Sequence, residues 1–178
     1  MRFRPESNEY NAYFKPYVDM VPEGDIIEIL VQQEKETKDL LKNLTDEEAR
    51  FRYEAHKWSI KQLIGHVADT ERVMSYRLLA IARGDTTPLP GFDQDAYVEQ
   101  AAFDEWPLEE LLKNFSAVRA STVHLLKGLR DADWTKMGEA NQSPLTVRAL
   151  AYIIAGHERH HRNIIQTRYL QSPRFPHA

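Results

Sequence analysis

Apolar residues recur three and four positions apart in four long segments of this sequence, and that spacing is its strongest constraint on the fold. In the segment that follows Pro107, the regularly spaced positions are Leu108, Leu111, Phe115, Val118, Thr122, Leu125 and Leu129. Such spacing places side chains on one face of an α-helix, and no segment shows the sustained period-two alternation of a half-buried strand. The 9 prolines lie outside these segments or at their starts. The sequence therefore predicts an all-α fold.

The expected helices have recognisable start signals. They span about residues 25–44, 59–83, 107–129 and 146–170. Ser59 and Gln62 match a capping box, in which side chains satisfy the free N–H groups of the first turn. The last helix can be capped by Thr146, or by Ser143 with a proline at its first helical position.

Four helices that each carry one narrow apolar stripe bury those stripes most simply in a four-helix bundle. The link at 84–106 has about 23 residues, which at roughly 3.3 Å per residue can cross the whole bundle. Helices two and three are therefore expected to run parallel, joined by this long crossover. Because long links without secondary structure are uncommon in compact domains, this one is a candidate for covering a site. We expect residues 1–178 to form one domain with its core at about 25–170.

Composition narrows the classes of function. The chain has no cysteine, which excludes disulfides, a cysteine nucleophile and thiolate metal sites, and fits a reducing cytoplasm. The 23 Lys and Arg against 27 Asp and Glu give a net charge of -4, so a nucleic-acid partner is not expected. No apolar run approaches the roughly 20 residues that cross a bilayer, and no signal peptide is visible. We expect a cytoplasmic protein that acts on a small molecule.

Histidines cluster on the fourth expected helix. Of 7 in the chain, His157, His160 and His161 fall within five residues. His157 and His161 are four apart, so both rings lie on one helix face, on the stripe that points into the bundle. His66 lies on the inward side of the second helix. Three imidazoles from two helices predict a divalent-metal site with at least one open position.

The donor set indicates which metal would bind. Without thiolates, zinc, nickel or iron(II) is favoured over copper(I), and the lack of a carboxylate set disfavours magnesium and calcium. A lone inward histidine is more often a hydrogen-bonded core residue than a ligand, so the pair at His157 and His161 carries the inference. His160 is interpreted as a bystander or a residue that supports a ligand. His56, His124 and His177 are interpreted as solvated.

The run from His157 to His161 also satisfies H-E-x-x-H, the motif of zinc proteases. Those enzymes take a third ligand downstream, but no acidic residue follows Glu158, and Ile164 and Thr167 replace the extended motif. A protease is therefore not predicted, and Glu158 stays a candidate acid or base.

Several polar residues lie near the expected site. Asp69 and Glu71 follow His66, and Glu71 falls on the apolar stripe, where it is a candidate buried carboxylate that orients a ligand ring. Salt bridging is the simpler interpretation of both. Glu34 and Thr37 interrupt the stripe of the first helix and could face the metal cavity.

Three blocks of sequence resemble the DinB-like family of metal-dependent enzymes. They are WSIKQLIGHVADTE at 58–71, GDTTPLPGFDQDAY at 84–97, and TVRAL at 146–150 followed by GHERHHR at 156–162. The resemblance covers about residues 25–170. It implies a four-helix bundle with a long crossover, often a homodimer, and a divalent metal on His66, His157 and His161. Family members include S-transferases that use low-molecular-weight thiols. One departure is Arg162-Asn163-Ile164, where many relatives have Arg-Gly-Gln.

Two classes of function stay open from the sequence. The first is an enzyme whose metal lowers the pKa of a bound thiol or water, which gives a thiol S-transferase or a hydrolase. The second is a non-enzymatic bundle that binds metal or another protein. With no cysteine and no recognisable nucleophile in the chain, an enzyme would draw its nucleophile from outside the protein.

Overall fold

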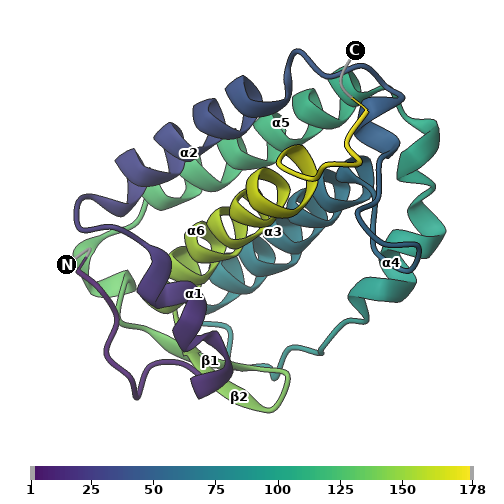
Figure 1. Ribbon diagram of the computed structural model, residues 1–178. Coiled ribbons are helices and arrows are strands. Elements are labelled where there is room, and N and C mark those ends of the chain that lie inside the picture. Colours follow the sequence, from purple (N-terminus) through teal and green to yellow (C-terminus); the bar gives the residue numbers. More distant parts are fainter. Residues whose placement is uncertain (1–2, 177–178) are drawn as a thin grey trace.

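The computed structural model describes residues 3–176, and Figure 1 shows a bundle of four long helices. The long helices are α2 (Ile26–Leu41), α3 (Ile60–Ala82), α5 (Leu108–Lys127) and α6 (Val147–Ile164). The predicted all-α four-helix bundle is confirmed. The outermost residues of the expected domain, and His177 among them, lie outside the described part of the chain.

The predicted start signals are present. Ser59 and Gln62 form the capping box of α3, and Thr146, one of the two candidates, caps α6 by accepting from the Ala149 N–H. The end of the last helix differs from the prediction. After Ile164 the backbone widens into a π-helical turn at Ile165–Leu170.

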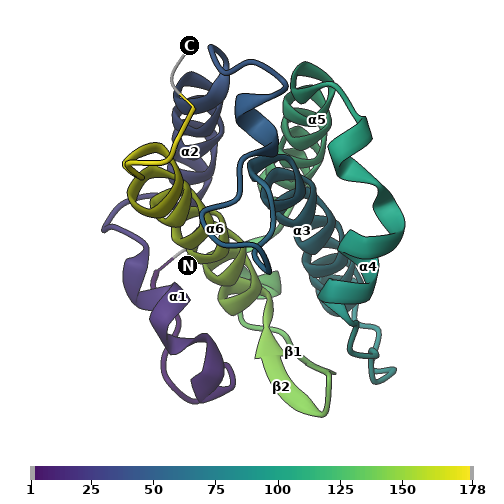
Figure 2. The same ribbon diagram turned by 45° about the vertical axis from the view of Figure 1, so that its right-hand side comes forward.

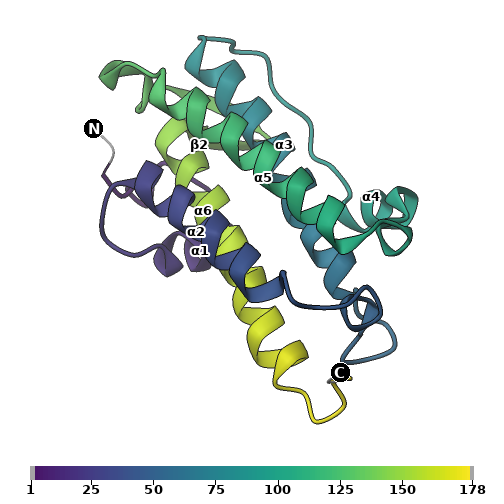
Figure 3. The ribbon, with the colours of Figure 1, turned by 90° about the horizontal axis from the view of Figure 1, so that it is seen from above.

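Helices α3 and α5 run in the same direction, as the long link predicted. Near their N-termini, the buried Lys61 ammonium donates to the carbonyl of Trp106, 2.7 Å away. Farther along, Arg72 donates to the side chain of Asn114. Residue numbers therefore increase in the same direction along both helices, as Figures 2 and 3 also show.

Helices α2 and α6 form the second parallel pair. Gln33 donates to the carbonyl of Ala155 at 3.0 Å, and Thr37, one turn later, donates to Glu158. This pair runs antiparallel to α3 and α5. Helix α6 packs against both α2 and α3 (Figure 1).

The link at 84–106 contains secondary structure that was not predicted from the sequence. It returns along α3 and forms α4 (Gln94–Ala101), which Asp93 caps, followed by a 3₁₀ turn at Phe103–Glu105. Helix α4 buries only Val98, so its sequence carries no apolar stripe to detect. The expected structureless crossover is therefore corrected to a crossover that includes a short helix.

Shorter elements close one end of the bundle. A hairpin of β1 (Met137–Ala140) and β2 (Ser143–Thr146) connects α5 to α6, and α1 (Lys15–Met20) packs against α6. The remaining 3₁₀ turns are Ala12–Phe14, Glu48–Arg50 and Asp131–Asp133. The strand sequences MGEA and SPLT do not alternate strictly between apolar and polar residues, which explains why no strand was predicted here.

The segment before α1 is held by a buried carboxylate. Glu9 accepts from the Thr146 hydroxyl at 2.7 Å and forms an ion pair with Arg148 at the start of α6. Burial raises the pKa of Glu9, but the hydrogen bonds from Arg148 and Thr146 outweigh that effect and hold its pKa below the usual value. The N-terminal segment is thereby fixed against α6.

Two apolar clusters fill the bundle, and a layer of buried polar side chains lies between them. On α3, apolar residues up to Ala68 belong to one cluster and those from Met74 onward to the other. The buried polar residues of the layer are Gln33, Thr37, His66, Thr70, Glu71, Arg119, Thr122, His157 and Glu158. Buried polar groups cost free energy unless they are hydrogen-bonded, so their pairing matters for stability.

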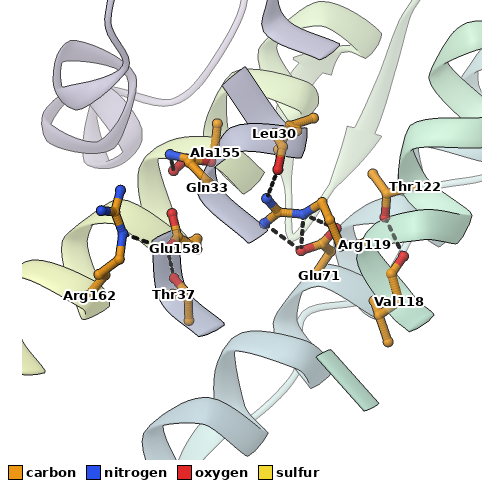
Figure 4. A network of polar contacts seen from close by, with 10 residues as sticks. All are labelled: Leu30, Gln33, Thr37, Glu71, Val118, Arg119, Thr122, Ala155, Glu158 and Arg162. Atoms are coloured by element: carbon orange, nitrogen blue, oxygen red, sulfur yellow. Dashed lines mark hydrogen bonds and ion pairs between the residues drawn. The ribbon is translucent and has the colours of Figure 1, made fainter. Parts of the chain in front are cut away.

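The best-paired part of this polar layer is the ion pair of Glu71 and Arg119 (Figure 4). The guanidinium donates to both carboxylate oxygens at 2.8–3.0 Å and to the carbonyl of Leu30. Both side chains are only 2% exposed. The pair thus ties α3, α5 and α2 together at one level.

Removing one partner of this pair should be costly. We expect Glu71→Leu to lower the free energy of unfolding by about 3–5 kcal/mol, because Arg119 is left charged and buried. The double variant Glu71→Leu with Arg119→Met should lose less than the single variant, since no unpaired charge remains. Urea unfolding followed by circular dichroism measures both values. Glu109→Gln, which breaks an exposed ion pair with Lys113, is the control and should cost under about 1 kcal/mol.

Candidate metal centre

Three histidine side chains converge inside the bundle. His66 comes from α3, and His157 and His161 come from successive turns of α6. The Nε2 atom of His157 lies 3.0 Å from Nε2 of His66 and 3.1 Å from Nε2 of His161. The structure therefore brings together the three residues that the spacing and the stripes predicted.

Neighbouring groups hold the rings in place. Thr70 Oγ1 lies 3.4 Å from Nδ1 of His66, one helical turn away. In the tautomer with the proton on Nδ1, this N–H donates to Thr70 Oγ1 and the lone pair of Nε2 is directed at the other rings. The centroid of the Trp58 ring lies 4.7 Å from that of the His66 ring, and the centroid of the Tyr17 ring lies 5.7 Å from that of the His157 ring.

Burial keeps the three imidazoles neutral at neutral pH. It lowers the pKa of His66 to about 4. Burial, reinforced by the neighbouring imidazoles, holds the pKa values of His157 and His161 well below the usual value for histidine. Neutral imidazole is the form that binds metal ions.

The three rings cannot satisfy one another by hydrogen bonds. A ring nitrogen carries either one proton or one lone pair. Nε2 of His157 can thus make one good hydrogen bond, yet it faces both His66 and His161. A divalent cation would accept a lone pair from all three, so the donor set fits a metal. The metal-compatible group contains no carboxylate, and three protein ligands leave a coordination position open.

His160 and Glu158 lie beside this centre without joining it. His160 is half-buried, with its ring 5.3 Å from that of Tyr17, and it belongs to no group of metal-compatible atoms among residues 3–176. Glu158 turns toward α2, where it accepts from Thr37, and it also accepts from Arg162 one turn later on α6 (Figure 4). Burial raises its pKa despite these partners. The carboxylate of the H-E-x-x-H run is therefore directed away from the imidazoles.

The other polar candidates also pair elsewhere. Asp69 bonds with Arg72 on its own helix. The carboxylate of Glu71 pairs with Arg119, which confirms the simpler interpretation of salt bridging over the candidate contact with a ligand ring. Glu34 accepts from Ser116 on α5. Thr37 donates to Glu158, so neither of the two candidates on α2 is hydrogen-bonded to a histidine ring.

A pocket with a volume of about 370 Å³ reaches the centre at His157 and Thr70. Three segments far apart in sequence wall it: the N-terminal segment around Tyr17, the link at Phe92, and the hairpin at Asn141. The prediction that the link covers part of the site is therefore supported by the residues it contributes. Burial raises the pKa of Tyr17 to about 12, so its phenol keeps its proton at neutral pH.

Sequence reasoning did not find these wall residues. Tyr17 and Asn141 belong to short elements without periodicity, and their place at the site depends on how the chain ends fold back. Arg77, which also lines the pocket, had a signal in the sequence. It is 11 positions after His66, on the same helix face as Thr70 and Met74.

Fold and site together define a helical bundle with a three-histidine centre of the kind that binds a divalent metal. The sequence profile of the DinB superfamily matches residues 29–165, and the chain belongs to this superfamily. It is 32% identical over 143 residues to a protein of Oceanobacillus iheyensis named "Putative metal-dependent hydrolase OB0413", covering 77% of this chain and 81% of that protein.

A solved structure has the same fold. YfiT from Bacillus subtilis, described as "a probable metal-dependent hydrolase with an unusual four-helix bundle topology", superimposes with a TM-score of 0.73 at 18% identity. The alignment covers 80% of this chain and 82% of YfiT. Within residues 3–176, no helix is both long enough and apolar enough to pass through a membrane.

The close approach of the N-terminal segment to the centre depends on Gly156. A Cβ atom at this position would overlap the backbone carbonyl of Tyr17. We expect Gly156→Ala to push α1 off α6 and to lower the free energy of unfolding by about 1–3 kcal/mol, measured by urea unfolding. Gly128→Ala is the control, because a Cβ there meets only ordinary contacts. Equal stability of the two variants would contradict the proposed close contact.

Proposed function

We propose that this protein is a divalent-metal-dependent hydrolase of a small molecule, with His66, His157 and His161 as the metal ligands. The observation that carries the proposal is the convergence of three neutral imidazoles at a pocket open to a small ligand. Zinc, nickel and iron(II) are the ions that this donor set favours.

The proposed chemistry divides between the ion and the chain. When bound, a divalent cation acts as a Lewis acid that polarises a substrate carbonyl and lowers the pKa of water. The histidines hold the ion, and Thr70 fixes the orientation of the His66 ring. Tyr17 lines the pocket with a protonated phenol, which can donate a hydrogen bond to a bound substrate.

The names of the two similar proteins support hydrolysis over thiol transfer. Transfer to a low-molecular-weight thiol, which the family resemblance implied, would use the same three ligands and stays the alternative. The accessible pocket beside His157 supports an enzyme over a purely structural metal site. The single domain, the homodimer and the cytoplasmic location stay predictions.

Metal content tests the ligand set. We expect protein purified without a histidine tag to hold about one divalent ion per chain, and His66→Ala, His157→Ala and His161→Ala each to lose most of it. His160→Ala should keep its metal, because its ring lies outside the cluster. Elemental analysis of the four variants measures this. Stoichiometric metal in all three ligand variants would show that the assignment is wrong.

Activity tests the reaction. A screen of small esters and amides, with and without added thiols, should find turnover that needs metal and water alone. Chelation should abolish this turnover and added divalent metal should restore it. Turnover only in the presence of a thiol would favour the transferase. Full turnover by metal-free His157→Ala would contradict both metal mechanisms.

A further inference from the structure

Arg77 is a buried cation without an acidic partner. Its side chain belongs to α3 and the residue is only 4% exposed. One guanidinium nitrogen donates to the carbonyl of Pro90 at 2.7 Å, and another lies 3.5 Å from the sulfur of Met74. No carboxylate among residues 3–176 lies within 4.0 Å of it, in contrast to the equally buried Arg119. A buried charge is costly unless an opposite charge meets it.

The pocket beside Arg77 has no negative charge of its own. Its lining contains no aspartate or glutamate, although the whole chain carries a net charge of -4. With His157 neutral, Arg77 is the one charged side chain among the lining residues. Apolar side chains also line the pocket, with Phe14, Met74 and Leu145 among them.

The position of Arg77 sets the geometry of a ligand. It follows His66 by 11 residues on one face of α3, a rise of about 16 Å, with Thr70 and Met74 between them. The contact with Met74 shows that the guanidinium leans back toward the histidines, which shortens this span. A molecule in the pocket can therefore reach both Arg77 and the metal centre.

We propose that Arg77 binds the carboxylate of an acidic substrate, whose apolar body lies along Met74 and whose hydrolysed bond lies at the histidines. A single guanidinium matches one negative charge and can hold a carboxylate through two parallel hydrogen bonds. The placement of the hydrolysed bond at the histidines rests on the proposed hydrolase function. The recognition of a carboxylate by Arg77 is independent of that function.

Binding to the metal-free protein tests this recognition separately from catalysis. In the presence of EDTA, calorimetry compares 4-phenylbutanoate with 4-phenylbutanamide, which share an apolar body and differ in charge. We expect wild-type protein to bind the carboxylate at least about tenfold more tightly than the amide. Arg77→Met should lose this preference, whereas Arg83→Met, which removes the exposed arginine at the C-cap of α3, should keep it.

The outcomes separate the possible roles of Arg77. Equal affinity of wild-type protein for the two probes, or no binding of the carboxylate, overturns the proposal. A preference retained in Arg77→Met overturns it as well. If Arg77→Met weakens both probes equally, the residue only holds the link through Pro90, which also contradicts carboxylate recognition. Arg77→Gln replaces the methionine variant if circular dichroism shows that the latter is unfolded.

Discussion

The layer of polar side chains buried at the middle of the bundle is the constraint on which the rest of this structure depends. Each such group gives up its hydrogen bonds with water, so it must find a partner inside the protein. Arg119 finds Glu71 and Leu30, and Glu158 finds Thr37 and Arg162. These contacts fix the level at which α2, α3, α5 and α6 meet.

The three imidazoles behave differently from the rest of the layer. They face one another, and their hydrogen-bonding capacity cannot be met within the group. The ion pair and hydrogen bonds of the other groups set the register of the helices, although Gln33 Oε1 and Glu158 Oε2 lack a hydrogen-bond partner among the described residues. These contacts position α6 and α3 and therefore the rings they carry, and the imidazoles keep capacity for a ligand.

The sequence predicted the features that have a local signal. The long helices and the convergence of His66, His157 and His161 follow from apolar stripes that extend over many turns. The caps follow from side chains at the helix starts, and the parallel crossover follows from the length of the link. Helix α1 buries only Val18 and α4 only Val98, so neither element leaves a detectable pattern. Salt bridging was the simpler interpretation of Glu71, and the ion pair confirms it, but its partner, Arg119, lies 48 residues away on another helix and was not predicted. A pairing of that kind depends on tertiary contacts that a local pattern does not contain.

The pocket and the histidine cluster draw on different parts of the chain. The histidines belong to the two central helices of the bundle, while the pocket combines residues of these helices with walls from the N-terminal segment, the link and the hairpin. Substitutions in the walls therefore change the shape and charge offered to a ligand with little effect on the interior that holds the centre. In such an arrangement the outer segments can be redesigned to admit a differently shaped ligand while the spacing of the three imidazoles is preserved.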